Sequence, residues 1–158
     1  MQRRTLFLLA FAAATAVSSA IAAPLPYDET ADAKAAVQQA LIAAKAGQRP
    51  VLVVFGANWC EDCRALDQAL KRGPNAALMA REFEVVKVDV GRFNRNLDVA
   101  EAYGNPIKKG IPAAVVLSAD NRVLYATRAG ELANARRMSE TGIHDFFEQV
   151  VKDARARP

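Results

Sequence analysis

Zinc ligands are scarce in this sequence of 158 residues, which contains two cysteines and one histidine. A structural zinc site takes about four protein ligands, most of them Cys or His. Copper can be held by two thiolates, but no methionine or histidine lies near the two cysteines. The sequence therefore predicts no metal site, although a metal-handling or non-enzymatic binding module is kept as an alternative.

An excess of one charge sign is also missing. The chain has 21 Lys and Arg against 17 Asp and Glu, and two of the positive charges are Arg3 and Arg4 near its start. It contains no basic stripe with interleaved aromatic residues, no phosphate-binding loop and no nucleotide fingerprint. These absences argue against nucleic acids and nucleotides as partners.

Long hydrophobic runs are absent except at the start of the chain. The apolar stretch 5–17 follows the positive sequence MQRR and precedes the small residues SSAIAA, a pattern typical of a signal peptide. We predict a signal peptide at residues 1–22, with cleavage after residue 22 or 23. A membrane anchor is the alternative, but the stretch is shorter than the ~20 residues that span a bilayer, and Pro24 ends it.

The segment 28–154 is predicted to form a single domain. Runs rich in β-branched residues predict strands at 51–55, 83–90, 113–118 and 123–127. Helical periodicity and stop signals predict helices at 28–47, 60–72, 74–82, 97–104 and 139–154. This order indicates the α/β class, with a mixed central sheet of about four strands and helices on both faces.

The first predicted helix has an apolar face and two candidate caps. Val37, Leu41 and Ile42 recur at helical spacing, so we expect all three to be buried. Asp28 and Thr30 are residue types that cap helix N-termini. The helix is therefore expected to begin close to them.

Both cysteines lie in the stretch NWCEDC, directly after the strand predicted at 51–55. Cys60 is expected in the first turn of the next helix, where free N–H groups and the helix dipole lower the pKa of a thiol below the usual ~8.5. A disulfide to Cys63, one turn further on, would close too short a loop to stabilise the chain much. Such a bond suits redox chemistry, in which Cys60 attacks a target disulfide and Cys63 resolves the mixed disulfide. A purely structural disulfide is the alternative.

Three stretches that follow one another in the chain carry a family resemblance. They are VLVVFGANWCEDCRALD, VVKVDV and KKGIPAAVVLSADNRVLYATRAGE, and they resemble the thioredoxin family over about residues 31–154. The chain is most similar to exported thioredoxin-like and disulfide isomerase-type members, which often have an acidic spacer between the cysteines. The resemblance implies a thioredoxin-like fold and thiol–disulfide exchange that uses the cysteine pair and no other cofactor.

The resemblance also implies a substrate site beside the cysteines. Pro112 matches the family's cis-proline, which lies against the pair, and Ile111 matches the residue whose backbone pairs with an extended substrate peptide. Trp59 is expected as an exposed apolar platform next to the sulfurs. A strand-starting role for Pro112 and simple core packing for Trp59 are the alternatives.

One position of the strand before the cysteines departs from the family pattern. Val54 stands where thioredoxins usually have a buried acid, and Lys87 matches the lysine that partners this acid. Lys87 is therefore expected to lack its usual neighbour, and a surface charge at a strand edge is an equally good interpretation. The proton of Cys63 would then leave through water or through another acid.

The acidic spacer, Glu61 and Asp62, allows two interpretations that are compatible. Acidic side chains in the first turn of a helix interact favourably with the helix dipole, and each stabilises the helix by about 0.3–1 kcal/mol. The same charges oppose the Cys60 thiolate, raise its pKa and favour the disulfide form, which tunes the pair towards donating electrons.

Together these features predict an exported, periplasmic and monomeric oxidoreductase that reduces or rearranges disulfides of exported proteins. Its substrates would be proteins with disulfides. Because a thiol pair outside the cytosol becomes oxidised, an upstream thiol reductant in the membrane would have to supply its electrons. An oxidising or isomerising member of the same fold is the alternative within this class.

Overall fold

The computed structural model of the chain describes residues 24–157. The signal peptide predicted at residues 1–22 lies outside the described residues. Among the helices of the described part, none is long and apolar enough to cross a membrane.

Four strands form one mixed sheet in the order β2-β1-β3-β4. They are β1 (Val51–Gly56), β2 (Glu84–Asp89), β3 (Ala113–Leu117) and β4 (Val123–Ala126). β2 runs parallel to β1, whereas β3 is antiparallel to both β1 and β4. The mixed four-stranded sheet predicted from the sequence is therefore confirmed, and β3 and β4 form an antiparallel hairpin at one edge.

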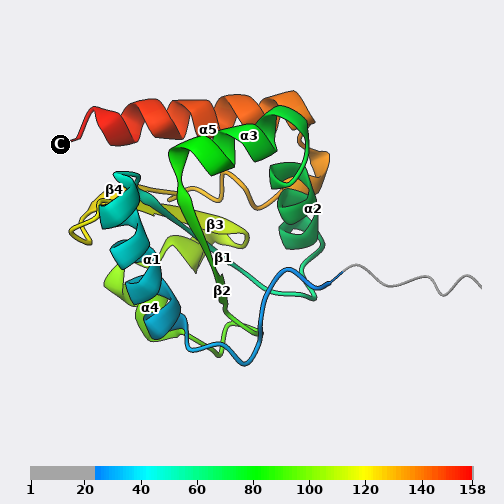
Figure 1. Cartoon of the computed structure of the whole chain (residues 1–158). Helices are drawn as coiled ribbons and strands as arrows, with labels where there is room; N and C mark the ends of the chain where they lie inside the picture. Colours follow the sequence, from blue (N-terminus) through cyan, green and yellow to red (C-terminus); the bar gives the residue numbers. More distant parts are fainter. Residues whose placement is uncertain (1–23, 158) are drawn as a thin grey trace, which may run out of the picture.

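Helices cover both faces of this sheet (Figure 1). α1 (Ala33–Gly47) and α4 (Leu97–Ala102) lie on one face, and α3 (Gly73–Glu82) and α5 (Glu140–Arg155) lie on the other. α2 (Glu61–Leu70) begins just after β1 and packs on the side of α3 and α5. This arrangement confirms the predicted α/β architecture.

The central strand β1 divides the core between the two layers. All six of its residues are buried, which explains why its sequence is a continuous apolar run rather than an alternating one. Val51, Val53 and Phe55 pack into the layer of α1, whereas Leu52 and Val54 pack into the layer of α5. The carboxyl end of β1 is thus fixed between two cores, and the cysteine loop follows it directly.

The predicted start of the first helix is wrong by several residues. Asp32 is the N-cap of α1, and its side chain accepts a hydrogen bond from the N–H of Ala35 at 3.0 Å. Asp28 instead accepts hydrogen bonds from the N–H and the hydroxyl of Thr30, at 2.8 and 2.7 Å. These two residues form a local turn before the helix, as Asp and Thr readily do.

The prediction that Ile42 is buried is also wrong, because its side chain is 64% exposed. The buried positions of α1 include Val37, Leu41 and Ala44, so the contact stripe is narrow and contains alanine. Ile42 lies beside this stripe and faces outwards.

Two short 3-10 helices lie within segments for which the sequence predicts neither a helix nor a strand. They are η1 (Pro106–Lys109), before β3, and η2 (Ala135–Arg137), before α5. η2 packs against α2, with Leu132 and Ala135 buried at this contact. The second of these helices is therefore held next to the cysteine helix.

Candidate active site

The two cysteines form a disulfide at the start of α2. Cys60 is the N-cap of the helix, and its Sγ accepts a hydrogen bond from the N–H of Cys63 at 3.1 Å. Cys60 is 6% exposed and Cys63 is 1% exposed. Cys60 is therefore the more accessible of the two cysteines, and it also lies next to the free N–H groups at the start of the helix.

The segment that precedes β3 lies against this disulfide. The peptide bond between Ile111 and Pro112 is cis, as predicted. The carbonyl oxygen of Ile111 is 3.7 Å from the Sγ of Cys60. Because β3 pairs with β1 and places Ala113 opposite Phe55, the fold brings together two segments that lie about fifty residues apart.

Trp59, next to Cys60 in the chain, forms an exposed platform, with 45% of its surface accessible. Its indole N–H donates to the carbonyl of Gly91 at 2.8 Å. Phe93, also 44% exposed, meets the indole edge to face, and the guanidinium of Arg92 lies 5.5 Å from the ring. The predicted exposure of Trp59 is confirmed, whereas its aromatic neighbour was missed by the sequence analysis.

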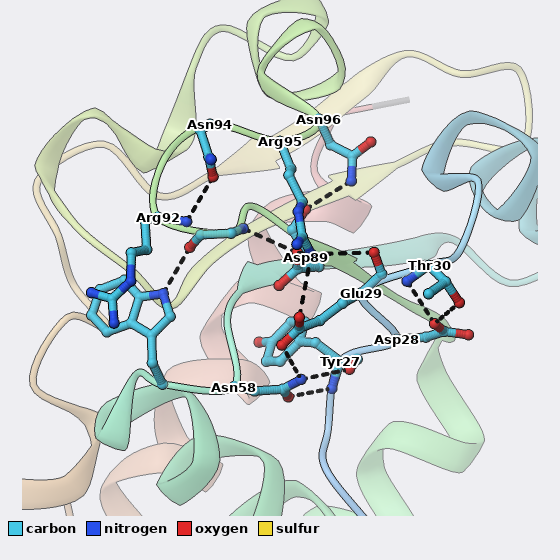
Figure 2. A network of polar contacts seen from close by, with 12 residues as sticks. Tyr27, Asp28, Glu29, Thr30, Asn58, Asp89, Arg92, Asn94, Arg95 and Asn96 are labelled. Carbon is cyan, nitrogen blue, oxygen red and sulfur yellow. Dashed lines mark hydrogen bonds and ion pairs between the residues drawn. The ribbon is translucent and has the colours of Figure 1, made fainter.

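The segment 24–31, here called the N-terminal strap, is fastened to the cysteine loop by Asn58. The N–H of Tyr27 donates to Oδ1 of Asn58 at 3.0 Å, and Nδ2 of Asn58 donates to the carbonyl of Tyr27 at 2.8 Å (Figure 2). Nδ2 of Asn58 also donates to Glu29 at 3.1 Å. Neither Tyr27 nor Asn58 was predicted as a site residue. The one feature of the sequence that could have indicated this contact is the position of Asn58, two residues before the first cysteine.

The side chain of Tyr27 reaches the backbone of Gly56 and is 3% exposed. A Cβ built on Gly56 would overlap the Tyr27 hydroxyl and would lie 3.0 Å from the Sγ of Cys63. Burial, assisted by the negative charge of Asp89, raises the pKa of Tyr27 far above its ordinary value. The hydroxyl is therefore neutral at any physiological pH.

A second polar network holds the loop after β2 to the strap (Figure 2). The buried carboxylate of Asp89 accepts from the N–H of Gly91 and from Nη1 of Arg95, both at 3.1 Å. Nη1 of Arg95 also donates to the carbonyl of Glu29 at 3.2 Å, and Asn96 donates to the carbonyl of Asp89 at 2.8 Å. This network supports the loop that carries the neighbours of Trp59.

A protein-family model described as thioredoxin-like matches residues 32–119, more than half of the chain. The chain belongs to the thioredoxin-like family. This confirms the family that the sequence motifs indicated, and the thioredoxin-like fold with its cysteine pair.

One solved structure is a close relative of this thioredoxin-like protein. It is a disulphide isomerase from Xylella fastidiosa Temecula1, with 58% sequence identity and a TM-score of 0.80. The match covers 82% of this chain and 98% of that chain. Among the curated proteins, none matches the chain.

More distant structures share the fold alone. A DsbH oxidoreductase is 16% identical with a TM-score of 0.55, and the match covers 86% of this chain and 88% of that one. A thioredoxin from Thermus thermophilus is 20% identical with a TM-score of 0.51, and the match covers 72% of this chain and 80% of that one.

The thioredoxin-like site contains an acid that the sequence analysis did not expect. Lys87 forms an ion pair with Asp67, whose other oxygen is 2.9 Å from Nζ of Lys71. Lys87 therefore lacks the usual acid at position 54, as expected, but Asp67 supplies another acidic neighbour. The acid comes from α2, one helical turn after Cys63, and not from position 54, where buried Val54 lies opposite Lys87 in the sheet. The surface-charge interpretation fails as well, because the Lys87 side chain is only 23% exposed and its burial lowers its pKa.

The acidic spacer of this thioredoxin-like protein has a basic partner. Nη1 of Arg136, in η2, lies 2.5 Å from the carboxylate of Glu61, and the backbone N–H of Arg136 donates to Asp62 at 3.0 Å. The guanidinium also lies 3.9 Å from Asp62. Both acids therefore dock η2 on α2, and one positive charge offsets part of their negative charge.

No group of three or more His, Cys, Asp or Glu residues in the described part of the chain could hold a metal ion. His144, on α5, contacts Asn75 at 3.1 Å through Nδ1. A cavity of about 620 Å³ lies at the opposite end of the sheet, between α1, α3 and α5, and neither cysteine lines it.

Proposed function

We propose that this protein is a thiol–disulfide oxidoreductase that reduces or rearranges disulfides in exported proteins. The observation that carries the proposal is the Cys60–Cys63 disulfide at the start of α2, with the carbonyl of Ile111 at 3.7 Å from Cys60. The 58% identity to a protein described as a disulphide isomerase supports it.

Cys60 is the attacking residue in this proposal. Its thiolate is stabilised by the N–H of Cys63 and by the helix dipole. It attacks one sulfur of a target disulfide, and a mixed disulfide forms while the other target sulfur leaves as a thiolate and takes up a proton. Cys63 then attacks Cys60, and the second target thiol is released.

The substrate would bind across the segment before β3. An extended peptide can add to the backbone of Ile111 as a further strand while its disulfide faces Cys60. Pro112 shapes this segment, and Trp59 offers apolar area beside it. The site would then recognise backbone and an exposed disulfide more than a particular sequence.

The compartment and the electron supply follow from the predicted signal peptide. In an oxidising periplasm the pair is reduced only if another thiol system supplies electrons. A thiol carrier in the membrane is the class of partner that fits this need. With such a donor the protein works as a reductase, and it rearranges disulfides when a second substrate thiol attacks the mixed disulfide before Cys63 does, which regenerates the Cys60 thiolate.

Two measurements test the proposed function directly. The protein should accelerate the reduction of insulin by dithiothreitol, and the pair should have a reduction potential towards about −270 mV. A potential near about −120 mV would show a strong oxidant and overturn the reducing direction. A stoichiometric metal ion in protein purified under reducing conditions would favour the metal-handling alternative.

Replacing Arg136 should reveal the effect of the acidic spacer on the pair. In Arg136→Gln, Glu61 and Asp62 lose their cation, so the Cys60 thiolate becomes less stable and the disulfide form is favoured. Exposed ion pairs contribute about 0.2–1 kcal/mol, so we expect a reduction potential roughly 5–20 mV more negative. Equilibration with glutathione buffers measures it. Arg137→Gln is the matched control, since Arg137 is exposed in the same helix, and an equal shift in both variants would contradict a role for the spacer.

A further inference from the structure

Tyr27 and Cys63 meet at one point of the backbone, the α-carbon of Gly56. A side chain at position 56 would occupy the place of the Tyr27 hydroxyl and would lie 3.0 Å from the Sγ of Cys63. The absence of a side chain there leaves room for the phenol of the strap and places its hydroxyl close to the buried sulfur. This is the sulfur of the resolving cysteine, the one with almost no access to water.

The Tyr27 side chain is held in this place from two sides. Its backbone is locked to Asn58 by two reciprocal hydrogen bonds, and its ring lies in the core that also contains Cys63. Burial raises the pKa of the phenol, so the hydroxyl keeps its proton. A neutral hydroxyl fixed near a sulfur is a hydrogen-bond donor to a thiolate.

The charged groups around Cys63 largely cancel one another. Asp67 comes from α2 and pairs with Lys87 of β2, whose Nζ lies 6.0 Å from the Tyr27 ring centroid. Asp89, at the end of β2, pairs with Arg95. Asp67 and Asp89 thus each have a base, whereas Asp62, next to Cys63 in the chain, shares Arg136 with Glu61. These groups therefore supply no net positive charge that would favour a thiolate at Cys63. The hydroxyl is the neutral donor that can do so.

We infer that the Tyr27 hydroxyl donates a hydrogen bond to the Cys63 thiolate and so promotes the resolving step. The inference rests on the proposed disulfide chemistry of the pair. In this step the Cys63 thiol loses its proton, and the thiolate attacks the Sγ of Cys60. The bond between Cys60 and the substrate sulfur breaks, and the substrate thiolate takes up a proton. Tyr27 keeps its own proton throughout.

This role gives the N-terminal strap a purpose in the reaction. Val54 leaves β1 without the buried acid that thioredoxins usually have on this strand, and the Tyr27 hydroxyl of a separate segment lies at Gly56, two positions further along the strand. The strap is thereby part of the reaction centre as well as a cover for the core.

The test is the titration of Cys63 in the reduced protein, followed by NMR of ¹³Cβ-labelled cysteine. In Tyr27→Phe we expect the pKa of Cys63 to rise by about one unit, the shift that a hydrogen bond to a charged group produces. The release of glutathione from its mixed disulfide with Cys60 should slow by about threefold, because the smaller thiolate fraction is partly offset by a more nucleophilic sulfur.

Tyr103→Phe is the matched control, since it removes a partly buried hydroxyl that donates to Asn121 at 3.0 Å on the surface. It should leave the Cys63 pKa unchanged.

If Tyr27→Phe does not fold, Asn58→Ala loosens the strap with the phenol intact and should shift the Cys63 pKa in the same direction. An unchanged Cys63 pKa in a folded Tyr27→Phe protein would overturn the inference. Failure of the wild type to reduce insulin would instead overturn the proposed function, because the titration does not depend on turnover.

Discussion

Replacing Cys63 with serine should trap this protein on its substrates, whereas replacing Cys60 should leave it unable to react with them. The two sulfurs differ in access, since Cys60 is at the helix start and Cys63 is almost fully buried. Without Cys63 the mixed disulfide formed by Cys60 has no internal thiol to resolve it. Without Cys60 the attacking thiolate is missing, and insulin reduction should fall on the order of 100-fold or more.

Non-reducing electrophoresis and intact-mass measurement after incubation with a disulfide-containing protein distinguish these outcomes. Covalent adducts should accumulate for Cys63→Ser and not for Cys60→Ser, and dithiothreitol should cleave them by reducing the mixed disulfide. The double serine variant is the control for adducts that do not involve the pair. Adducts on Cys60→Ser alone would reverse the roles of the two cysteines, and full insulin reduction by Cys60→Ser would refute the proposed function.

The sequence predicted those parts of the molecule that depend on local patterns. The apolar run at 51–55 required a strand covered on both faces, and β1 is buried throughout. The placement of Cys60 at a helix start followed from the order of strand, motif and helix. The approach of Ile111 to Cys60 spans fifty-one positions, and it was predicted only because the family resemblance supplied it. Periodicity failed at Ile42, where alanines take part in the contact stripe.

The polar contacts around the pair could not be predicted in the same way. Asp67 looks like a surface position of a helix, and Arg136 looks like one charge in a basic stretch. Each is important because packing brings it to a partner far away in the sequence, Lys87 in one case and the acidic spacer in the other. Such ion pairs depend on how α2 packs against β2 and η2. The hydrophobic pattern of the sequence does not show which charged side chains come within contact distance where these elements pack together.

Adding a single methyl group at Gly56 should destabilise the folded protein. In Gly56→Ala the new Cβ would overlap the hydroxyl of Tyr27 and lie 3.0 Å from the Sγ of Cys63. Neither neighbour can move freely, because Tyr27 is buried and clamped by Asn58 and Cys63 is bonded to Cys60. Overpacking a core in this way costs about 1–3 kcal/mol. Urea unfolding of the oxidised protein measures the loss.

A double-mutant cycle with Tyr27→Leu tests the physical reason for this loss. Leucine lacks the phenol end that fills the space at Gly56, so the alanine methyl should fit once the phenol is gone. The cost of Gly56→Ala should then shrink, with a coupling of about 1–2 kcal/mol between the two sites, within the range found for residues in contact. Gly47→Ala, at the exposed end of α1, should show no coupling to Tyr27→Leu. Additive costs for Gly56 and Tyr27 would mean that the phenol does not occupy this space, and the strap would then lose its contact with the resolving cysteine.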